Sequence, residues 1–205
     1  IEYNGKIFQG CSSLDFLEAD QILIPLEKLY RRYTGESLAV KLSDFADVSE
    51  RIQYLVTQVE EITKIDNFGA YLTAMLEIDA FFMNEDRHTN NIAVIYNEKT
   101  QKYELSPFFD QGLCMFADIN QDYPIDQSLE YCLEKIEAKP FSSDFDIQLD
   151  AAEELYGIQI GFQFTFKDIQ IYLQKNSENY PREVIRRVEQ LLRRQMRKYG
   201  HLMKK

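Results

Sequence analysis

The sequence predicts an α+β protein that is mostly helical and contains one central β-hairpin. Apolar residues recur with helical spacing in several long segments, whereas the runs IAVIY and KYELS have the composition of two paired strands. The chain is 45% hydrophobic and has only 8 Gly and 5 Pro among its 205 residues, so it can bury a sizeable core. We therefore expect residues 1–205 to form one folded unit.

The N-terminal part of the chain combines two short strands with two helices. The first 13 residues contain Asn4-Gly5 between short runs, a pattern typical of a turn between two strands. Residues 25–35, PLEKLYRRYTG, predict a helix that carries basic residues in its last turns and ends at its final glycine. A shorter helix is expected over residues 37–45.

Two longer helices follow. Residues 49–65 place their apolar side chains on a single face, which predicts an amphipathic helix. Asn67 is expected to cap the next helix, which continues to about Met83 and is apolar nearly all round. A helix of that kind usually lies at the centre of a domain.

The predicted hairpin comes next and is followed by more helices. Residues 92–96 and 102–106 form its two strands, and residues 107–116 form a loop behind it. The segment 160–166 fits either a short strand or a loop. The remaining helices are expected at about residues 126–138, 146–156, 166–174 and 180–199.

Cysteine usage and hydropathy favour a cytoplasmic protein. Cys11, Cys114 and Cys132 are far apart, form no zinc-binding spacing, and are odd in number, which suits reduced thiols. No apolar run reaches the roughly 18 residues of a membrane-spanning helix. The N-terminus has no signal-peptide pattern. We therefore expect neither secretion nor a membrane partner.

The net charge of −11 is unevenly distributed. From Arg182 to Lys205, nine basic and two acidic residues give +7, so the rest of the chain carries −18. Such an acidic body disfavours direct nucleic-acid binding, which needs clustered positive charge. Within the basic segment, residues such as Val184, Leu191 and Tyr199 trace one apolar stripe. This pattern predicts a helix packed on the core with its arginines in solvent.

Two polar motifs flank the predicted hairpin. The first, NEDRHTNN (84–91), places Asn91 five positions after Asp86, and the second, DQG, begins at Asp110. Phosphoryl transfer explains this arrangement, because Asp86 can accept the proton of an attacking hydroxyl while Asn91 and Asp110 hold Mg²⁺ against nucleotide phosphates. Gly112 would let the backbone turn sharply beside the metal-binding carboxylate. Taken alone, an Asp-x-Gly sequence after a strand is also typical of a simple turn.

The segments NEDRHTNNIAVI and LSPFFDQG resemble the C-terminal lobe of the HipA-like serine/threonine protein kinases. In that family a central helix ends in an Asp-x-His-x-x-Asn loop, and a strand pair leads to a Pro-x-x-Asp motif. The resemblance is strongest over residues 68–116. The chain departs from the HRD and DFG motifs of other protein kinases, since Asn84-Glu85 precede Asp86 and Gln111 replaces the Phe.

The resemblance implies a protein-kinase-like C-lobe that uses ATP and Mg²⁺ to phosphorylate a Ser or Thr hydroxyl of a protein. Asp86 would be the catalytic base, and Asn91 and Asp110 would be the metal ligands. His88 would lie near the transferred phosphate, although an imidazole that only braces the loop is equally open. Arg87 is expected to pair with an acidic neighbour. The resemblance also admits an antitoxin-like partner.

The chain lacks a loop that could cover the phosphates of a nucleotide. It contains no GxGxxG, and residues 5–12 match GxxxxGK[ST] only with Cys11 in place of the lysine, which argues against that site. In the HipA-like family an N-lobe would precede this segment. We therefore expect residues 1–16 to be an inter-lobe remnant, the N-lobe to be absent from this chain, and the C-lobe alone to bind nucleotide weakly.

Other functions stay open at this point. The DRHxxN pattern also occurs in phosphoinositide kinases, so a lipid or small-molecule kinase is one alternative. A non-catalytic pseudokinase or interaction module is another, although Asp86, Asn91 and Asp110 are all present. A metal-dependent hydrolase with several histidine ligands is excluded, because the chain has only His88 and His201.

Overall fold

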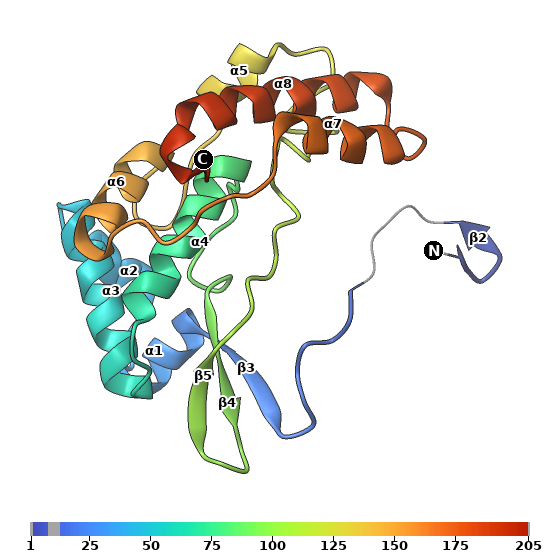
Figure 1. The fold of residues 1–205 in the computed structure, drawn as a ribbon. Helices are drawn as coiled ribbons and strands as arrows, with labels where there is room; N and C mark the ends of the chain where they lie inside the picture. The colour runs from blue at the N-terminus through green and yellow to red at the C-terminus, as the bar shows by residue number, and fades with distance from the viewer. Residues whose placement is uncertain (1, 8–12, 205) are drawn as a thin grey trace.

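A computed structural model describes residues 2–7 and 13–204 and shows a group of helices with a small sheet at one end (Figure 1). Helix α4 (Phe68–Phe82) lies between the others, and α3 (Val48–Thr63) and α6 (Phe145–Tyr156) pack along it. Ten of the residues of α4 are buried, because its sequence is apolar nearly all round. The expected central helix is therefore confirmed.

The main sheet has three antiparallel strands in the order β3-β4-β5. The predicted hairpin is confirmed as β4 (Ala93–Asn97) and β5 (Lys102–Leu105). The third strand, β3 (Gln21–Pro25), was not expected from the sequence, and it pairs along β4 from Gln21 opposite Asn97 onward. Its partner is distant in the chain, so no local turn signal marks the pairing.

The N-terminal hairpin consists of β1 (Glu2–Tyr3) and β2 (Lys6–Ile7). Its turn lies at Asn4 and Gly5, which have φ values of 50° and 71°. Both values are in the left-handed region that Asn and Gly tolerate best, so the predicted turn is confirmed. Residues 10–12, which include the cysteine that replaces the lysine of a phosphate-binding loop, lie outside the described part of the chain.

The first two helices lie where they were predicted, although the second is shorter than the expected range of residues 37–45. Helix α1 (Leu26–Thr34) ends at Gly35, whose φ of 83° allows a left-handed cap. Helix α2 (Leu38–Ser43) begins after Ser37, whose side chain accepts a hydrogen bond from the backbone of the first turn. Both helices turn buried leucines toward α3, which continues the core from the sheet to α4.

The start of α4 differs from the prediction. Asn67 occupies the N-cap position with a φ of 65°, but its side chain makes no capping hydrogen bond. Instead, the backbone N–H of Phe68 donates to Oε1 of Glu60 on the preceding helix, at 2.9 Å. A carboxylate from α3 thus satisfies a free N–H group of α4 and fixes the angle between the two helices.

The C-terminal half of the chain is helical, as expected, and the segment before α7 is a loop. Within that loop Phe162 donates its N–H to the carbonyl of Leu202 at 2.8 Å and forms a single bridge with Met203. The chain terminus therefore closes against the loop rather than adding a strand. The remaining elements are α5 (Leu129–Lys135), α7 (Phe166–Lys175), α8 (Arg182–Lys198) and a short 3₁₀ helix (Gly200–Leu202).

The prediction that the arginines of α8 all face solvent is wrong for Arg187. This side chain is buried, and its guanidinium donates to the carbonyls of Tyr123, Pro124 and Gln127. The bonds fix the segment between Asp110 and α5 against α8. An arginine inside an otherwise apolar stripe marks a place where irregular backbone needs donors, which helical spacing alone cannot indicate.

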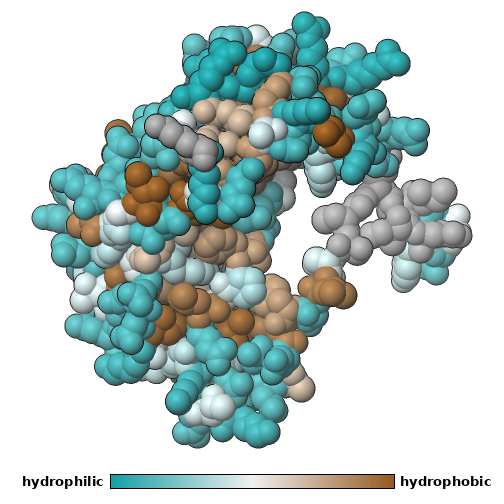
Figure 2. Space-filling model, viewed as in Figure 1, coloured by the Kyte–Doolittle hydropathy of each residue, from teal (hydrophilic) through white to brown (hydrophobic). Residues whose placement is uncertain are grey.

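Two hydrophobic clusters meet along α4. One joins the first part of α4 to the sheet and helices α1, α2, α3 and α6, and the other joins its last turn to α5, α7 and α8. Figure 2 shows a mostly hydrophilic surface on one face of the molecule, with apolar side chains gathered toward its centre. Among the described residues, no helix is long and apolar enough to cross a membrane.

Candidate functional site

The first polar motif begins where α4 ends. Met83 has a φ of 54°, so the backbone reverses there and leads directly into residues 84–91. The N–H of Asn84 donates to the carbonyl of Asp79 at 2.9 Å, and its side-chain amide donates to the Asp79 carboxylate at 2.8 Å. The loop is thus attached to the last turn of the central helix from its first residue.

Arg87 anchors this loop in the protein interior. Its side chain is 0% exposed, and it binds Asp79 in a bidentate ion pair, with Nε–Oδ2 at 2.7 Å and Nη2–Oδ1 at 3.0 Å. The expected pairing of Arg87 with an acidic neighbour is therefore confirmed. Burial raises the pKa of Asp79, and hydrogen bonds from Arg87 and Asn84 oppose that rise. Because both charged groups are buried away from water, removal of either one would leave the other as an unpaired buried charge.

The same guanidinium connects the two polar motifs. Nη1 of Arg87 donates to the carbonyl of Asn91 at 2.7 Å and to the carbonyl of Phe109 at 3.0 Å. Phe109 immediately precedes Asp110. One nitrogen atom therefore holds the backbone of Asn91 and that of the residue before Asp110.

The Asp86 carboxylate lies among three nitrogen-bearing side chains. Its Oδ1 is 3.5 Å from Nζ of Lys139, whereas its Oδ2 is 3.3 Å from Nδ2 of Asn91 and 3.8 Å from Nε2 of His88. The side chain is 28% exposed, so a hydroxyl group of a second molecule can reach it. A carboxylate with these neighbours is suited to accept a proton while its charge is balanced nearby.

His88 has features of both roles that the sequence left open. Its backbone N–H donates to the carbonyl of Asp86, and its carbonyl accepts from Asn91 N–H, at 2.9 and 2.8 Å. Its Nδ1 accepts from the N–H of Asn90 at 3.2 Å, so the ring does brace the loop. The side chain is also 42% exposed beside Asp86, which leaves Nε2 accessible to a ligand.

Asn91 and Asp110 supply oxygen atoms of the kind that Mg²⁺ prefers. The Asn91 amide nitrogen donates to the Asp86 carbonyl at 2.9 Å, which leaves the amide oxygen available to a cation. Asp110 is exposed. In the described part of the chain, no cluster of three or more His, Cys, Asp or Glu residues could hold a metal ion. Oxygen ligands of this kind would suit a hydrated Mg²⁺ that also binds phosphates, rather than an all-protein metal cage.

The sharp turn of the second motif lies at a different residue from the one predicted. Asp110 itself has a φ of 54°, whereas Gly112 is not in the left-handed region. Aspartate tolerates this conformation better than most residues, because its short polar side chain can interact with the local backbone. The metal-ligand candidate and the turn residue are therefore one and the same.

Two further contacts attach the first motif to distant parts of the chain. Thr89 donates through its hydroxyl to Glu27 on α1 at 3.1 Å, and its carbonyl accepts from the Glu27 N–H. Glu85 accepts a short hydrogen bond from the hydroxyl of Tyr123. Burial, followed by the bond to Glu85, raises the pKa of Tyr123, so the phenol stays protonated and donating. Neither contact was predicted from the sequence.

Lys139 is the site residue that sequence reasoning missed. It lies far beyond both motifs in the chain, and its neighbours in sequence form no recognisable pattern. The structure places its ammonium group against Asp86, between α5 and α6. The packing of α6 against α4 brings this segment to the first polar motif.

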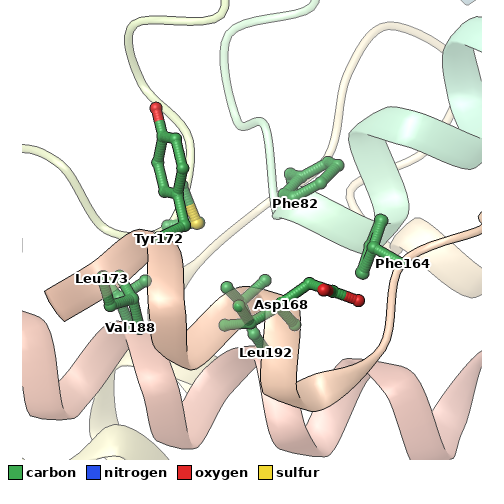
Figure 3. A pocket seen from close by; sticks show the side chains of 9 residues that line it. Phe82, Phe164, Asp168, Tyr172, Leu173, Val188 and Leu192 are labelled. Atoms are coloured by element: carbon green, nitrogen blue, oxygen red, sulfur yellow. The ribbon is translucent and has the colours of Figure 1, made fainter. Parts of the chain in front are cut away.

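A separate apolar pocket lies between α7 and α8 and the end of α4 (Figure 3). Its one charged residue, Asp168, already accepts hydrogen bonds from the N–H and hydroxyl of Thr165 at the start of α7. The pocket therefore offers no free group for phosphoryl chemistry. Nearby, burial raises the pKa of the Cys114 thiol to about 12, which excludes an activated cysteine nucleophile at that position.

Comparisons with known proteins address the fold. The sequence matches no protein-family model, and no curated protein matches it. The structure is similar to the crystal structure of the proinflammatory kinase CtkA of Helicobacter pylori, with a TM-score of 0.62 and 14% sequence identity. The match covers 92% of this chain and 72% of that one. The chain has a kinase-like fold. This confirms the predicted fold class, while the HipA-like family remains a prediction.

Proposed function

We propose that this chain carries the catalytic loop and metal ligands of a kinase that transfers the γ-phosphoryl group of ATP to a Ser or Thr hydroxyl of a protein. The observation that carries the proposal is the position of Arg87, whose Nη1 binds the backbone at Asn91 and next to Asp110. This contact joins the segments that carry the two candidate Mg²⁺ ligands, and the side chain of Asn91 in turn binds the candidate base Asp86. Phosphoryl transfer requires that combination, and a simple surface turn does not.

The residues divide the chemistry between them. Asp86 accepts the proton of the attacking hydroxyl, and the amide of Asn91 holds the Asp86 carbonyl and carboxylate in place. The Asn91 and Asp110 oxygens would hold Mg²⁺, which neutralises charge on the nucleotide phosphates when it is bound. Arg87 keeps the loops at a fixed separation from the protein interior and does not touch the substrate.

The resemblance to the HipA-like kinases implies that residues 1–16 would link this lobe to an N-lobe. In the part of this segment that the structure describes, the Phe16 ring lies 6.4 Å from the ring of Phe109, next to Asp110. A link in this position would pass next to the candidate metal ligand Asp110. The isolated chain would then expose one wall of a nucleotide cleft and bind Mg-ATP weakly, so an increase in its melting temperature of more than a few degrees with millimolar Mg-ATP would argue against this arrangement.

A lipid or small-molecule kinase uses the same loop chemistry, and a pseudokinase would keep the fold without transfer. We favour the protein kinase because the resemblance in both motifs is to the HipA-like type. We propose ATP and Mg²⁺ as the cofactors and a protein as the substrate. An antitoxin-like partner would control the activity. The cytoplasm is the proposed location, since the two described cysteines, Cys114 and Cys132, are not paired.

The test is transfer of radiolabelled phosphate from ATP by the full product of the gene, with and without added protein extract. The Asp86→Asn variant should lose about 100-fold or more of the transfer rate, because its side chain cannot accept the proton. Asp126→Asn, a substitution of another exposed aspartate outside the site, serves as the matched control. Label on lipid or small molecules would support the alternative substrates, and no label from a folded wild type that binds no nucleotide would refute the proposal.

A further inference from the structure

Lys139 is placed at the candidate base by buried structure. The side-chain amide of Gln148, which is 1% exposed on α6, donates to the Lys139 carbonyl at 3.2 Å. The N–H of Ala138 donates to the carbonyl of Ser143 at 2.8 Å, which closes the same turn. The backbone of Lys139 is therefore fixed from the core, whereas its side chain is 49% exposed and ends at Asp86.

The ion pair of Lys139 differs from those of the neighbouring lysines. Lys135 pairs with Asp122 at 2.8 Å, and Lys198 pairs with Asp146 at 2.7 Å. Asp122 is exposed, Asp146 is half-buried and also accepts a hydrogen bond from the Tyr199 hydroxyl, and neither acid has a role in the proposed chemistry. Lys139 has Asp86 as its salt-bridge partner among the described residues, at the longer distance of 3.5 Å. A long, half-exposed pair stabilises the fold little, so stability does not account for the placement.

The chemistry of phosphoryl transfer explains the position of Lys139 better. When Asp86 takes the proton of an attacking hydroxyl, the hydroxyl oxygen lies within hydrogen-bond reach of that carboxylate. The phosphorus atom then lies about 3 to 3.5 Å beyond the hydroxyl oxygen, with negative charge spread over the oxygens bound to phosphorus. An ammonium group beside Oδ1 of Asp86 is close enough to bind one of these oxygens. The Lys139 ammonium group would then exchange its long contact with the Asp86 carboxylate for a contact with the negative charge that develops on the phosphoryl oxygens.

We propose that Lys139 is a catalytic residue that binds the phosphoryl group during its transfer. The inference rests on the proposed function. In the step, the acceptor oxygen forms a bond to the γ-phosphorus, and the bond from that phosphorus to the β,γ-bridging oxygen breaks. ADP leaves with the electron pair of the broken bond, and the proton of the acceptor passes to Asp86. Lys139 donates a hydrogen bond to a non-bridging γ-oxygen and keeps all its protons.

The test measures binding of a transition-state mimic, which needs no identified acceptor. The full product of the gene is titrated with Mg-ADP in the presence and absence of aluminium fluoride, which imitates the phosphoryl group in transfer. The wild type should bind the fluoroaluminate complex more tightly than ADP alone. Lys139→Met should lose about 100-fold of this gain and keep its affinity for ADP, because the contact exists only with the transferring group. Lys139→Arg should retain part of the gain.

The controls separate this role from a merely structural one. Lys135→Met removes a nearby lysine that does not touch Asp86 and should keep the full gain. If Lys139 acted only by holding Asp86, its removal would have no effect in an Asp86→Asn background, so a loss that persists there supports direct contact. If Lys139→Met keeps the full gain in affinity with fluoroaluminate, the inference is overturned and the proposed function still stands. A wild type that binds ADP but gains nothing from fluoroaluminate, or that binds neither, refutes both.

Discussion

The two polar motifs of the candidate site are built in opposite ways. In the first, Asn84, Glu85, Arg87, Thr89 and Asn91 all form side-chain hydrogen bonds to protein atoms. In the second, residues 110–112 are exposed and form none within the described part of the chain. The backbone next to Asp110 is held by Arg87, but its carboxylate is not.

This difference fits a division between what the protein must fix and what a ligand can arrange. A general base must meet a hydroxyl with little error, so its loop is set before substrate arrives. A Mg²⁺ ligand can be oriented by the ion and by the phosphates, because the ion keeps several waters and takes few protein ligands. Rigidity is thus concentrated in the first motif. Three predictions test the contrast, in order of their expected effect on the free energy of unfolding.

The largest effect is expected from Arg87→Met. The substitution leaves the buried Asp79 carboxylate without its partner, which should lower the free energy of unfolding by about 3–5 kcal/mol. Urea unfolding followed by circular dichroism measures the loss. Arg31→Met, which removes an exposed arginine from its pair with Glu27, is the control and should cost less than about 1 kcal/mol, because Glu27 keeps its bonds to Ala39 and Thr89. Equal, small losses in both variants would contradict the anchoring role of Arg87.

Tyr123→Phe should have an intermediate effect. It removes the donor to Glu85 and should lower the free energy of unfolding by about 1.5–3 kcal/mol at pH 8. Burial, and then Glu85, raises the pKa of Tyr123 above the ordinary 10.0, so above that pH the unfolded phenol ionises first and the wild type loses stability. The difference between wild type and variant should therefore narrow from pH 8 to pH 10.5. If the difference in the free energy of unfolding stays constant between pH 8 and pH 10.5, the pKa of Tyr123 is not raised in the folded protein.

Asp110→Asn should have the smallest effect on folding, below about 0.5 kcal/mol, because the exposed side chain has no protein partner in the described residues. Its effect on Mg²⁺-dependent nucleotide binding should be much larger. Loss of residues that merely support a metal ligand costs about 10- to 100-fold in affinity, and loss of a ligand should cost no less. Calorimetric titration of Mg-ADP into the full product of the gene measures this, with Asp126→Asn as the control. Unchanged affinity and Mg²⁺ dependence would remove Asp110 from the metal site.

Most of the fold could be predicted from local sequence signals. Helical spacing located each of the longer helices, and the strand composition located the hairpin at residues 92–106. Strand β3 was missed because its pairing with β4 is non-local and QILIP contains no alternation of polar and apolar residues. The burial of Arg187 was missed for a related reason, since its partners are backbone carbonyls of a loop about sixty residues away.

The candidate site was predictable only in part. The spacing of Asp86, Asn91 and Asp110 around a hairpin was sufficient to propose the chemistry, because a hairpin fixes where its two ends lie. Lys139 and Tyr123 reach the same loop from segments whose position depends on how α5 and α6 pack. No periodicity in a single sequence reports such packing. The parts of a site that come from distant segments are therefore the parts that require a structure.

The shared contact of Arg87 has a consequence for engineering the chain. Arg87 and the pairing of β4 with β5 together hold the separation of the two motifs, so the hairpin tip is free to change in length. At that tip residues 98–101 are exposed, and the side chain of Asn97 closes the turn on the N–H groups of Lys99 and Thr100. An epitope tag or a fluorescent label inserted there should leave the loops undisturbed. The tip is thus a natural attachment point for a reporter close to the site.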